Sequence, residues 1–188
     1  MSDMSRVISQ ILRDIKVELS DEFDRNFERQ GFFSERWKRS RRSTAGGGAT
    51  LIDTGKLRRS ITSRSDATSI TFYTTEPYAA IHNEGGEIKV TAKMKRFFWA
   101  KYYEASGSFG RRKDGSLRRD RRNARLSDAA SMWQYMALMK VGSTIKIPKR
   151  RFLGASVEVE RAVREIVEEN IAEYVGNELI IKIQEDLK

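Results

Sequence analysis

The 188-residue chain has no cysteine, one histidine and only two prolines. Without cysteine, disulfides and thiolate metal sites are excluded. The single histidine, His82, leaves little scope for a zinc site or a histidine-based catalytic triad. No apolar run approaches the roughly 20 residues that a membrane-spanning helix needs. We therefore expect no metal, no cofactor and no membrane partner.

The features of a secretory signal are also missing. The first twenty residues interleave acids with aliphatics and offer no small-residue cleavage site. Because this pattern is unlike a signal peptide, we expect the protein to be cytosolic where it is made.

Charge is abundant but unevenly placed. Charged residues make up 33% of the chain and hydrophobic residues 39%, which predicts a thin core and apolar surface that other subunits help to cover. Residues 89–125 hold thirteen lysines and arginines against three acids, an excess equal to the net charge of +10 for the whole chain. The remainder is therefore close to neutral, and the basic character belongs to one segment.

Hydrophobic periodicity predicts a long helix at each end of the chain. Apolar residues recur every four positions through the first 27 residues, which favours an amphipathic helix that stops at Gly31. A second long helix is expected to begin near Ser156 and to break near Gly176. Residues 40–50, with three consecutive glycines, are typical of a flexible linker.

Short elements are expected between the terminal helices. Two β-rich runs at 61–65 and 69–75 predict an antiparallel hairpin. A short helix is expected over 77–84, stopped by the glycines at 85–86. This order of elements predicts a single α+β domain over residues 1–188, in which a small antiparallel sheet is packed by the long N- and C-terminal helices.

Two further segments, 87–90 and 143–148, have the composition of short strands, and we expect them to pair. Residues 91–142 then form a basic insertion at the tip of a hairpin. That insertion is expected to be partly helical, over 91–105 and 128–140, and partly disordered in its Gly-, Ser- and Arg-rich middle.

The stretch LIDTGKLRRSI, residues 51–61, combines an acid, a hydroxyl, a glycine and three bases. It is not a P-loop, because the G-x-x-x-x-G-K-[ST] spacing is absent. A phosphate can bind at such a helix start, but a structural corner is the simpler interpretation. In that interpretation Asp53 or Thr54 caps a short helix, and Arg58 and Arg59 remain available for a neighbouring subunit.

The one candidate catalytic set is His82 with Glu84 and Asp53, which would suit a hydrolase or nuclease. The structural alternative is that His82 bonds locally at the end of the short helix. With no second histidine, no cysteine and no acid pair, we favour the structural interpretation. We therefore expect no catalytic residue and no enzyme.

The basic segment has aromatic residues among its bases, a combination found on nucleic-acid surfaces. The rings also suit an ordinary core seam against the second helix of the insertion, around Trp133 and Met136, with the bases solvated. A third possibility is an acidic protein partner. The candidate DNA or partner contacts are Lys93, Lys95, Arg96, Arg111, Arg112, Lys113, Arg118, Arg119, Arg121 and Arg122.

Three blocks in order, LIDTGKLRRSI (51–61), YAAIHNEGG (78–86) and IPKRRFLGAS (147–156), resemble the phage virion morphogenesis family, also called tail completion proteins. The family pattern runs DTG-x-L-x-x-S, then YA-x-x-H-x-x-G, then P-x-R-x-F-L-G. Either Arg150 or Arg151 supplies the arginine of the third block. The other matching residues are Asp53, Thr54, Gly55, Leu57, Ser60, Tyr78, Ala79, His82, Gly85, Pro148, Phe152, Leu153 and Gly154.

The resemblance implies a structural protein of a tailed phage or prophage. Such a protein is assembled in the bacterial cytoplasm and resides in the virion, in the tail or neck. It would form a homo-oligomeric ring that docks other neck or tail proteins in tail completion or head–tail joining, with no reaction.

The chain departs from the family pattern between Lys89 and Ser143, where the basic insertion is longer than the expected hairpin. Whether the insertion faces DNA or a neighbouring subunit stays open. The alternative function is a non-catalytic nucleic-acid-binding module that uses residues 89–125.

Overall fold

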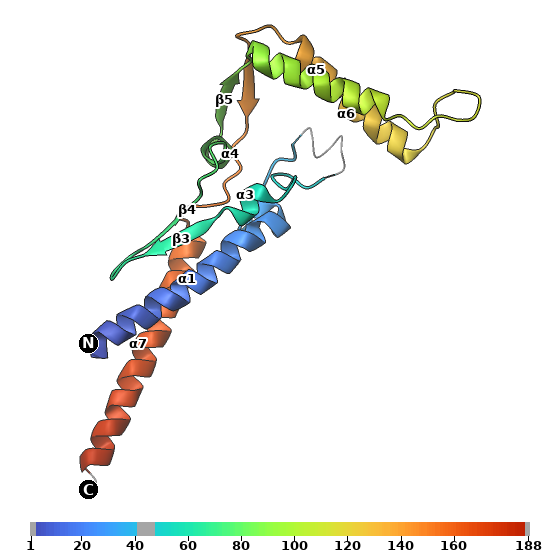
Figure 1. The fold of residues 1–188 in the computed structure, drawn as a ribbon. Coiled ribbons are helices and arrows are strands. Elements are labelled where there is room, and N and C mark those ends of the chain that lie inside the picture. The colour runs from blue at the N-terminus through green and yellow to red at the C-terminus, as the bar shows by residue number, and fades with distance from the viewer. Residues whose placement is uncertain (1–2, 41–47, 187–188) are drawn as a thin grey trace.

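The computed structural model describes residues 3–40 and 48–186, so most of the predicted linker lies outside the described residues. Helices and strands alternate along the chain, with a long helix at each end (Figure 1), which confirms the α+β prediction. The elements are α1 (Asp3–Arg29), β1 (Gly31–Phe32), β2 (Glu35–Arg36), α3 (Lys56–Arg59), β3 (Thr62–Ser65), β4 (Ile70–Tyr73), α4 (Ala79–Glu84), β5 (Gly86–Lys89), α5 (Ala92–Gly107), α6 (Arg121–Leu138), β6 (Thr144–Ile147) and α7 (Val157–Asp186).

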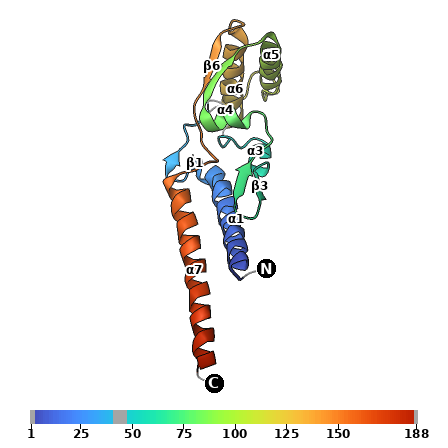
Figure 2. The same ribbon diagram turned by 90° about the vertical axis from the view of Figure 1, so that its left-hand side faces the viewer.

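Helices α1 and α7 pack against each other and form one core cluster. Leu19 and Phe23 of α1 are 5% and 3% exposed, and Ile166 and Val167 of α7 are among the residues that cover them. Burying a large apolar side chain of this kind stabilises the fold by about 1.5–3 kcal/mol. Figures 1 and 2 both show α7 running on past the N-terminal end of α1, so its second half leaves this core.

The predicted break near Gly176 is wrong, because α7 runs without interruption from Val157 to Asp186. One glycine inside a helix costs only about 1 kcal/mol relative to alanine, which the flanking helix formers offset. No atom lies within 4 Å of the place where a Cβ on Gly176 would sit, so no packing forces a kink there. Long as it is, neither α7 nor any other helix of the described residues is apolar enough to cross a bilayer.

In the described ranges the strands form three separate two-stranded antiparallel ribbons rather than one sheet. Strands of two to four residues offer too short a ladder to recruit a third neighbour. The hairpin expected over 61–75 is confirmed as β3 and β4, with Ser63 opposite Phe72. Phe72 packs edge-on against Phe23, with 5.1 Å between the ring centroids, which places this ribbon on α1.

The predicted pairing of residues 87–90 with 143–148 is also confirmed. Strands β5 and β6 are antiparallel, with Ile88 opposite Ile145. Between them the chain leaves the body of the molecule and returns as α5, a loop and α6 (Figure 1), which we call the arm (residues 90–143).

An aromatic seam holds the two helices of the arm together. Phe98 of α5 is 7% exposed, and its ring stacks on Trp133 of α6 at 6.1 Å between centroids. Phe97 meets the same indole edge-on at 5.9 Å. The core-seam interpretation is therefore confirmed for these rings.

Helix α6 begins at Arg121, earlier than the predicted start at Asp128. The side chain of Asp120 accepts the N–H of Asn123 at 2.8 Å and so caps the helix. Asn123, 6% exposed, exchanges two 2.8 Å hydrogen bonds with the backbone of Gly110. These local bonds draw the end of the arginine-rich loop into the helix, and composition alone does not indicate them.

Candidate functional site

The three motif blocks meet in one buried cluster. Leu57 of the first block, Ala79 of the second and Phe152 of the third are each at most 4% exposed. They pack with Phe27 of α1 and with Trp37, and the Phe27 ring lies 5.5 Å from the rings of both Trp37 and Phe152. We call these five residues the motif junction. It shows that the blocks, far apart in sequence, build one corner of the fold.

Asn83 of α4 joins the second block to the third. Its Oδ1 accepts the backbone N–H groups of Phe152 at 3.0 Å and Leu153 at 3.1 Å, and its Nδ2 donates to the carbonyl of Leu153 at 3.0 Å. Beside it, the N–H of Arg150 donates to the carbonyl of His82 at 2.8 Å. Sequence reasoning did not single out Asn83, although its place inside the second block was visible.

Gly85 permits the closest approach between the same two blocks. Its φ is +76°, and a Cβ there would lie 2.7 Å from the backbone nitrogen of Lys149. A side chain would therefore strain the backbone and collide with it. As predicted, α4 also stops at Gly85, where the chain turns into β5.

The first block is a corner, but its cap differs from the predicted one. The N-cap of α3 is Gly55, with φ +74° and no side-chain capping bond, in place of Asp53 or Thr54. Glycine reaches this left-handed conformation without strain, which lets the turn tighten before the helix. The Thr54 hydroxyl still accepts the N–H of Lys56 at 3.4 Å. With four residues, α3 also lacks the aligned peptides that favour a bound phosphate.

The arginines of the first block are held within the chain. Arg58 donates to both Asp24 and Glu28 of α1, at 2.7 Å for Glu28. The prediction that Arg58 is available for a neighbouring subunit is therefore wrong. Arg59 donates to the carbonyl of Thr54 at 2.9 Å. Sequence spacing did not indicate the link to α1, because it joins segments about thirty residues apart.

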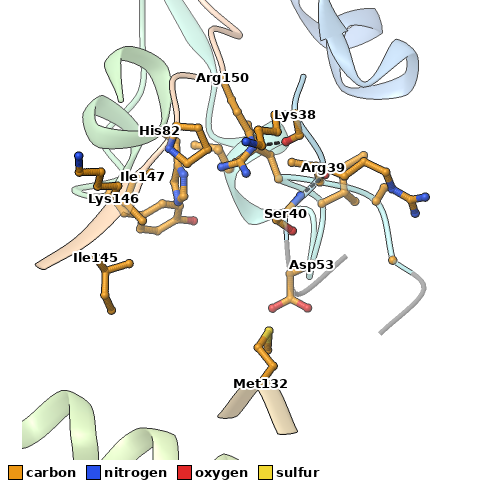
Figure 3. A pocket seen from close by; sticks show the side chains of 18 of the residues that line it. Lys38, Arg39, Ser40, Asp53, His82, Met132, Ile145, Lys146, Ile147 and Arg150 are labelled. Atoms are coloured by element: carbon orange, nitrogen blue, oxygen red, sulfur yellow. Dashed lines mark hydrogen bonds between the residues drawn. The ribbon is translucent and has the colours of Figure 1, made fainter. Parts of the chain in front are cut away.

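A cleft of about 1430 Å³ lies between the arm and the motif blocks. Figure 3 shows it from close by, with α6 on one side and the first block on the other. Its arm wall carries Met132 and Met136 of α6 and Met139, which directly follows α6, and Ile145 and Ile147 of β6 also line it. The lining also includes five basic side chains, those of Lys38, Arg39, Lys56, Lys146 and Arg150.

Arg150 is the unusual member of this lining. The residue is only 5% exposed, and its Nε donates to the carbonyl of Lys38 at 2.8 Å. No carboxylate of the described residues pairs with its guanidinium, and burial lowers its pKa. Arginine is rarely buried without an acid, because the desolvated charge needs compensation. The third block thus places at the cleft an arginine that pairs with no carboxylate of the described residues.

The candidate catalytic residues do not form a site. No hydrogen bond or ion pair joins His82 to Glu84 or Asp53 in the part of the chain that the structure describes. Glu84 instead accepts from Asn83 Nδ2 at 2.6 Å and lies 3.8 Å from Lys149 Nζ. In Figure 3 the Asp53 carboxylate points toward α6 and away from the imidazole. No group of three residues able to hold a metal occurs in these same ranges.

His82 makes the stability of the fold pH-dependent. Its Nδ1 is buried and has no hydrogen-bond partner among the residues that the structure describes, and burial together with the charge of Arg150 lowers the imidazole pKa below 6.5. In the unfolded chain the imidazole therefore becomes protonated near pH 6.5, whereas in the folded chain it stays neutral to a lower pH. Stability is highest above that pH. As the pH falls toward the folded pKa, we expect the free energy of unfolding to decrease by up to about 1.4 kcal/mol per pH unit.

The measurement is urea unfolding between neutral and mildly acidic pH, for the wild type and for His82→Gln. Ordinary carboxyl pKa values of about 4 lie below this window. Hydrogen bonds from Arg29 and Arg58 lower the pKa values of Glu22 and Asp24 further, so these two groups contribute little to it. The variant should lose most of the slope. An unchanged slope in His82→Gln would contradict the assignment.

The ten candidate contact residues of the arm fall into two groups. Lys93, Lys95 and Arg96 lie in the first two turns of α5, next to β5. The other seven, from Arg111 to Arg122, lie in the loop and in the first turn of α6, at the far tip of the arm (Figure 1), and are exposed. The candidate contacts, treated as one set in the sequence, therefore lie in two patches near opposite ends of α5.

The fold and the motif junction can be set against known families. A model of the phage virion morphogenesis family matches residues 1–172. The chain belongs to this family. The match covers α1, the three motif blocks, the arm and the first half of α7, so the resemblance predicted from the blocks is confirmed. We found no significant match among curated proteins or solved structures.

Membership in the virion morphogenesis family identifies the chain as a phage protein of particle assembly. The motif junction explains why the three blocks occur together, since Leu57, Ala79 and Phe152 pack on one another. Two further motif residues make local hydrogen bonds beside them: Ser60 donates to the carbonyl of Leu57 at 2.7 Å, and the carbonyl of Arg151 accepts the Trp37 indole N–H at 2.6 Å.

Proposed function

We propose that this virion morphogenesis protein acts in tail completion or head–tail joining. Copies of the chain would assemble into a ring in the host cytoplasm and dock to other neck or tail proteins, so that the protein ends in the tail or neck of the virion. The protein would work by binding alone, with no reaction.

The observation that carries this proposal is the shape of the subunit. The arm and the second half of α7 project from opposite ends of the molecule, and Figures 1 and 2 agree on this. Both carry large exposed apolar side chains, among them Tyr103 and Tyr135 on the arm at 65% and 58%, and Leu179 and Ile180 on α7 at 56% and 55%. Projections of this kind are covered when subunits meet neighbours in an assembly.

Sedimentation velocity over a wide concentration range, followed by negative-stain imaging, tests the proposal. We expect closed oligomers, alone or after addition of neck and tail proteins of the same phage. A protein that stays monomeric at high concentration, and also with those proteins present, would overturn the proposal.

A second candidate function is sequence-independent DNA contact through the tip of the arm. Arg111, Arg112 and Lys113 are exposed there, and no carboxylate of the described residues forms an ion pair with them. Exposed bases bind phosphates by releasing counterions, so the affinity falls steeply with salt.

The two basic patches supply a matched comparison for this candidate. One variant replaces residues 111–113 with alanine, and its control replaces Lys93, Lys95 and Arg96, which removes the same charge. If the tip contacts duplex DNA, the first variant should reduce the salt slope of log K by about two to three, and the control should leave it nearly unchanged. Equal losses would indicate unspecific charge attraction, and no salt-dependent binding would exclude DNA contact.

A further inference from the structure

The second half of α7 extends beyond the core that α1 and α7 share (Figures 1 and 2). At its start, Asn170 still reaches α1, where its Nδ2 donates to Asp14 at 3.1 Å. None of residues 171–180 is buried. Ile171, Val175 and Leu179 follow one another at four-residue spacing and are 48%, 48% and 56% exposed. Residues at this spacing share a face, so the helix presents an apolar stripe to its surroundings.

The stripe is bordered by acids. From Glu165 to Ile180 the helix carries five glutamates and no base. At 100° per residue, Glu168 and Glu178 lie on the same side of the helix as the stripe. No ion pair engages either of them among the described residues. Two such helices side by side would bring like charges together, which disfavours pairing of α7 with α7.

The cleft beside the arm has the complementary character. Its arm wall is lined by three methionines at and beside the end of α6, flexible side chains that adapt to the helix they receive. Its basic residues outnumber its acids, Asp53 and Glu87. Arg150 adds a buried guanidinium that pairs with no carboxylate of the described residues. A volume of about 1430 Å³ accommodates about three turns of an α-helix, the length of the stripe.

The stripe of α7 cannot reach the cleft of its own chain, because the cleft and the end of α7 lie at opposite ends of the molecule (Figures 1 and 2). We infer that the second half of α7 of one copy lies in the cleft of the next copy. Its apolar stripe packs on the methionines of α6, and a glutamate beside the stripe pairs with Arg150. The inference rests on the proposed self-assembly and names the surfaces that carry it.

The contact is head-to-tail, with different surfaces on the two copies, and contacts of this type build rings or open filaments. It also involves a part of the chain that the family match does not reach, since the match stops at residue 172 and most of the stripe follows it. The binding mode is that of an amphipathic helix in a groove, with the apolar side chains as anchors.

Disulfide crosslinking tests the contact directly, because the chain has no cysteine of its own. Val175→Cys in one copy is mixed with Met136→Cys in another and oxidised gently. The control partner is Leu117→Cys, which is exposed in the loop between α5 and α6 and does not line the cleft. We expect the Val175–Met136 heterodimer to form at least about tenfold faster than the Val175–Leu117 heterodimer, since docking raises the local concentration.

Charge exchange supplies an independent readout. Lys38→Glu with Lys146→Glu reverses two exposed bases of the cleft, and Glu168→Lys with Glu178→Lys reverses the acids of the stripe. Each double variant should assemble poorly, and a mixture of the two should recover assembly, because every cleft then finds an oppositely charged helix. Circular dichroism establishes that both variants remain folded.

The outcomes separate this inference from the proposed function. If the wild type assembles but the Val175–Met136 heterodimer does not form, the inference is overturned and the proposed function stands. The same holds if the cleft variants assemble normally. Preferential Val175–Val175 homodimers would show that α7 pairs with itself. If the wild type does not assemble and the cysteine variants do not crosslink, alone or with neck and tail proteins, both the inference and the proposed function are overturned.

Discussion

Replacing Phe152 with alanine is expected to lower the free energy of unfolding by about 3–5 kcal/mol. The side chain is 1% exposed and sits at the centre of the motif junction, against Phe27 and the first two motif blocks. The cavity cannot collapse easily, because its walls belong to α1, α3 and α4, which other contacts hold apart. Since domains are stable by only about 5–15 kcal/mol, this is a large part of the total.

Urea unfolding and thermal unfolding followed by circular dichroism measure the effect, and we expect the midpoint temperature to fall by about 10 °C. Phe97→Ala is the matched control, because it removes the same side chain from the arm, where the residue is 51% exposed. That variant should lose about 1 kcal/mol, the size of its edge-on contact with Trp133. Equal losses in the two variants would show that the motif junction is not the centre of the fold.

The features that sequence reasoning predicted correctly are those with a local signal. The four-residue periodicity of α1 follows from the helix repeat, and the hairpin of β3 and β4 follows from two β-rich runs around a polar turn. The pairing of β5 with β6 follows from two short segments of strand-like composition, one on each side of the insertion. Each of these depends on residues that are adjacent or similar in sequence.

The features that were missed depend on contacts between distant segments. The salt bridges of Arg58 involve acids on α1, and the role of Asn83 appears only when the third block lies beside α4. The unpaired charge of Arg150 is likewise visible only once the cleft has formed. Motif matching identified these blocks as a set without showing that they touch.

The candidate site illustrates the same limit. Sequence reasoning placed the interesting chemistry either at His82 or in the basic segment, treated as one unit. In the structure the candidate contacts of that segment lie in two patches, and the more distinctive surface is the cleft. The cleft is lined by the residues after β2, the first block, α6 and β6. No single stretch of sequence carries the signature of that surface, because its members are brought together only by the arm folding back.

Asn83→Ala is expected to destabilise the fold by about 3 kcal/mol. The substitution leaves the N–H groups of Phe152 and Leu153 and the carbonyl of Leu153 without the partner that now satisfies them. Each unsatisfied buried polar group costs about 1–3 kcal/mol, and the half-buried position of Leu153 allows water to recover part of this. The effect should be local first, so the amides of residues 152 and 153 should lose hydrogen-exchange protection before the rest of the chain.

Two further variants decide whether the hydrogen bonds are responsible. Asn83→Asp keeps an oxygen for the two N–H groups, removes the donor to the Leu153 carbonyl and to Glu84, and places a second carboxylate beside the exposed Glu84. Because the two N–H groups stay satisfied, it should still lose less stability than the alanine variant. Asn177→Ala, on the exposed second half of α7, removes an asparagine that anchors nothing and should change stability by only a few tenths of a kcal/mol. If Asn83→Ala behaves like Asn177→Ala, the packing of Phe152 alone holds the third motif block in place, and the hydrogen bonds of the Asn83 side chain contribute little to stability.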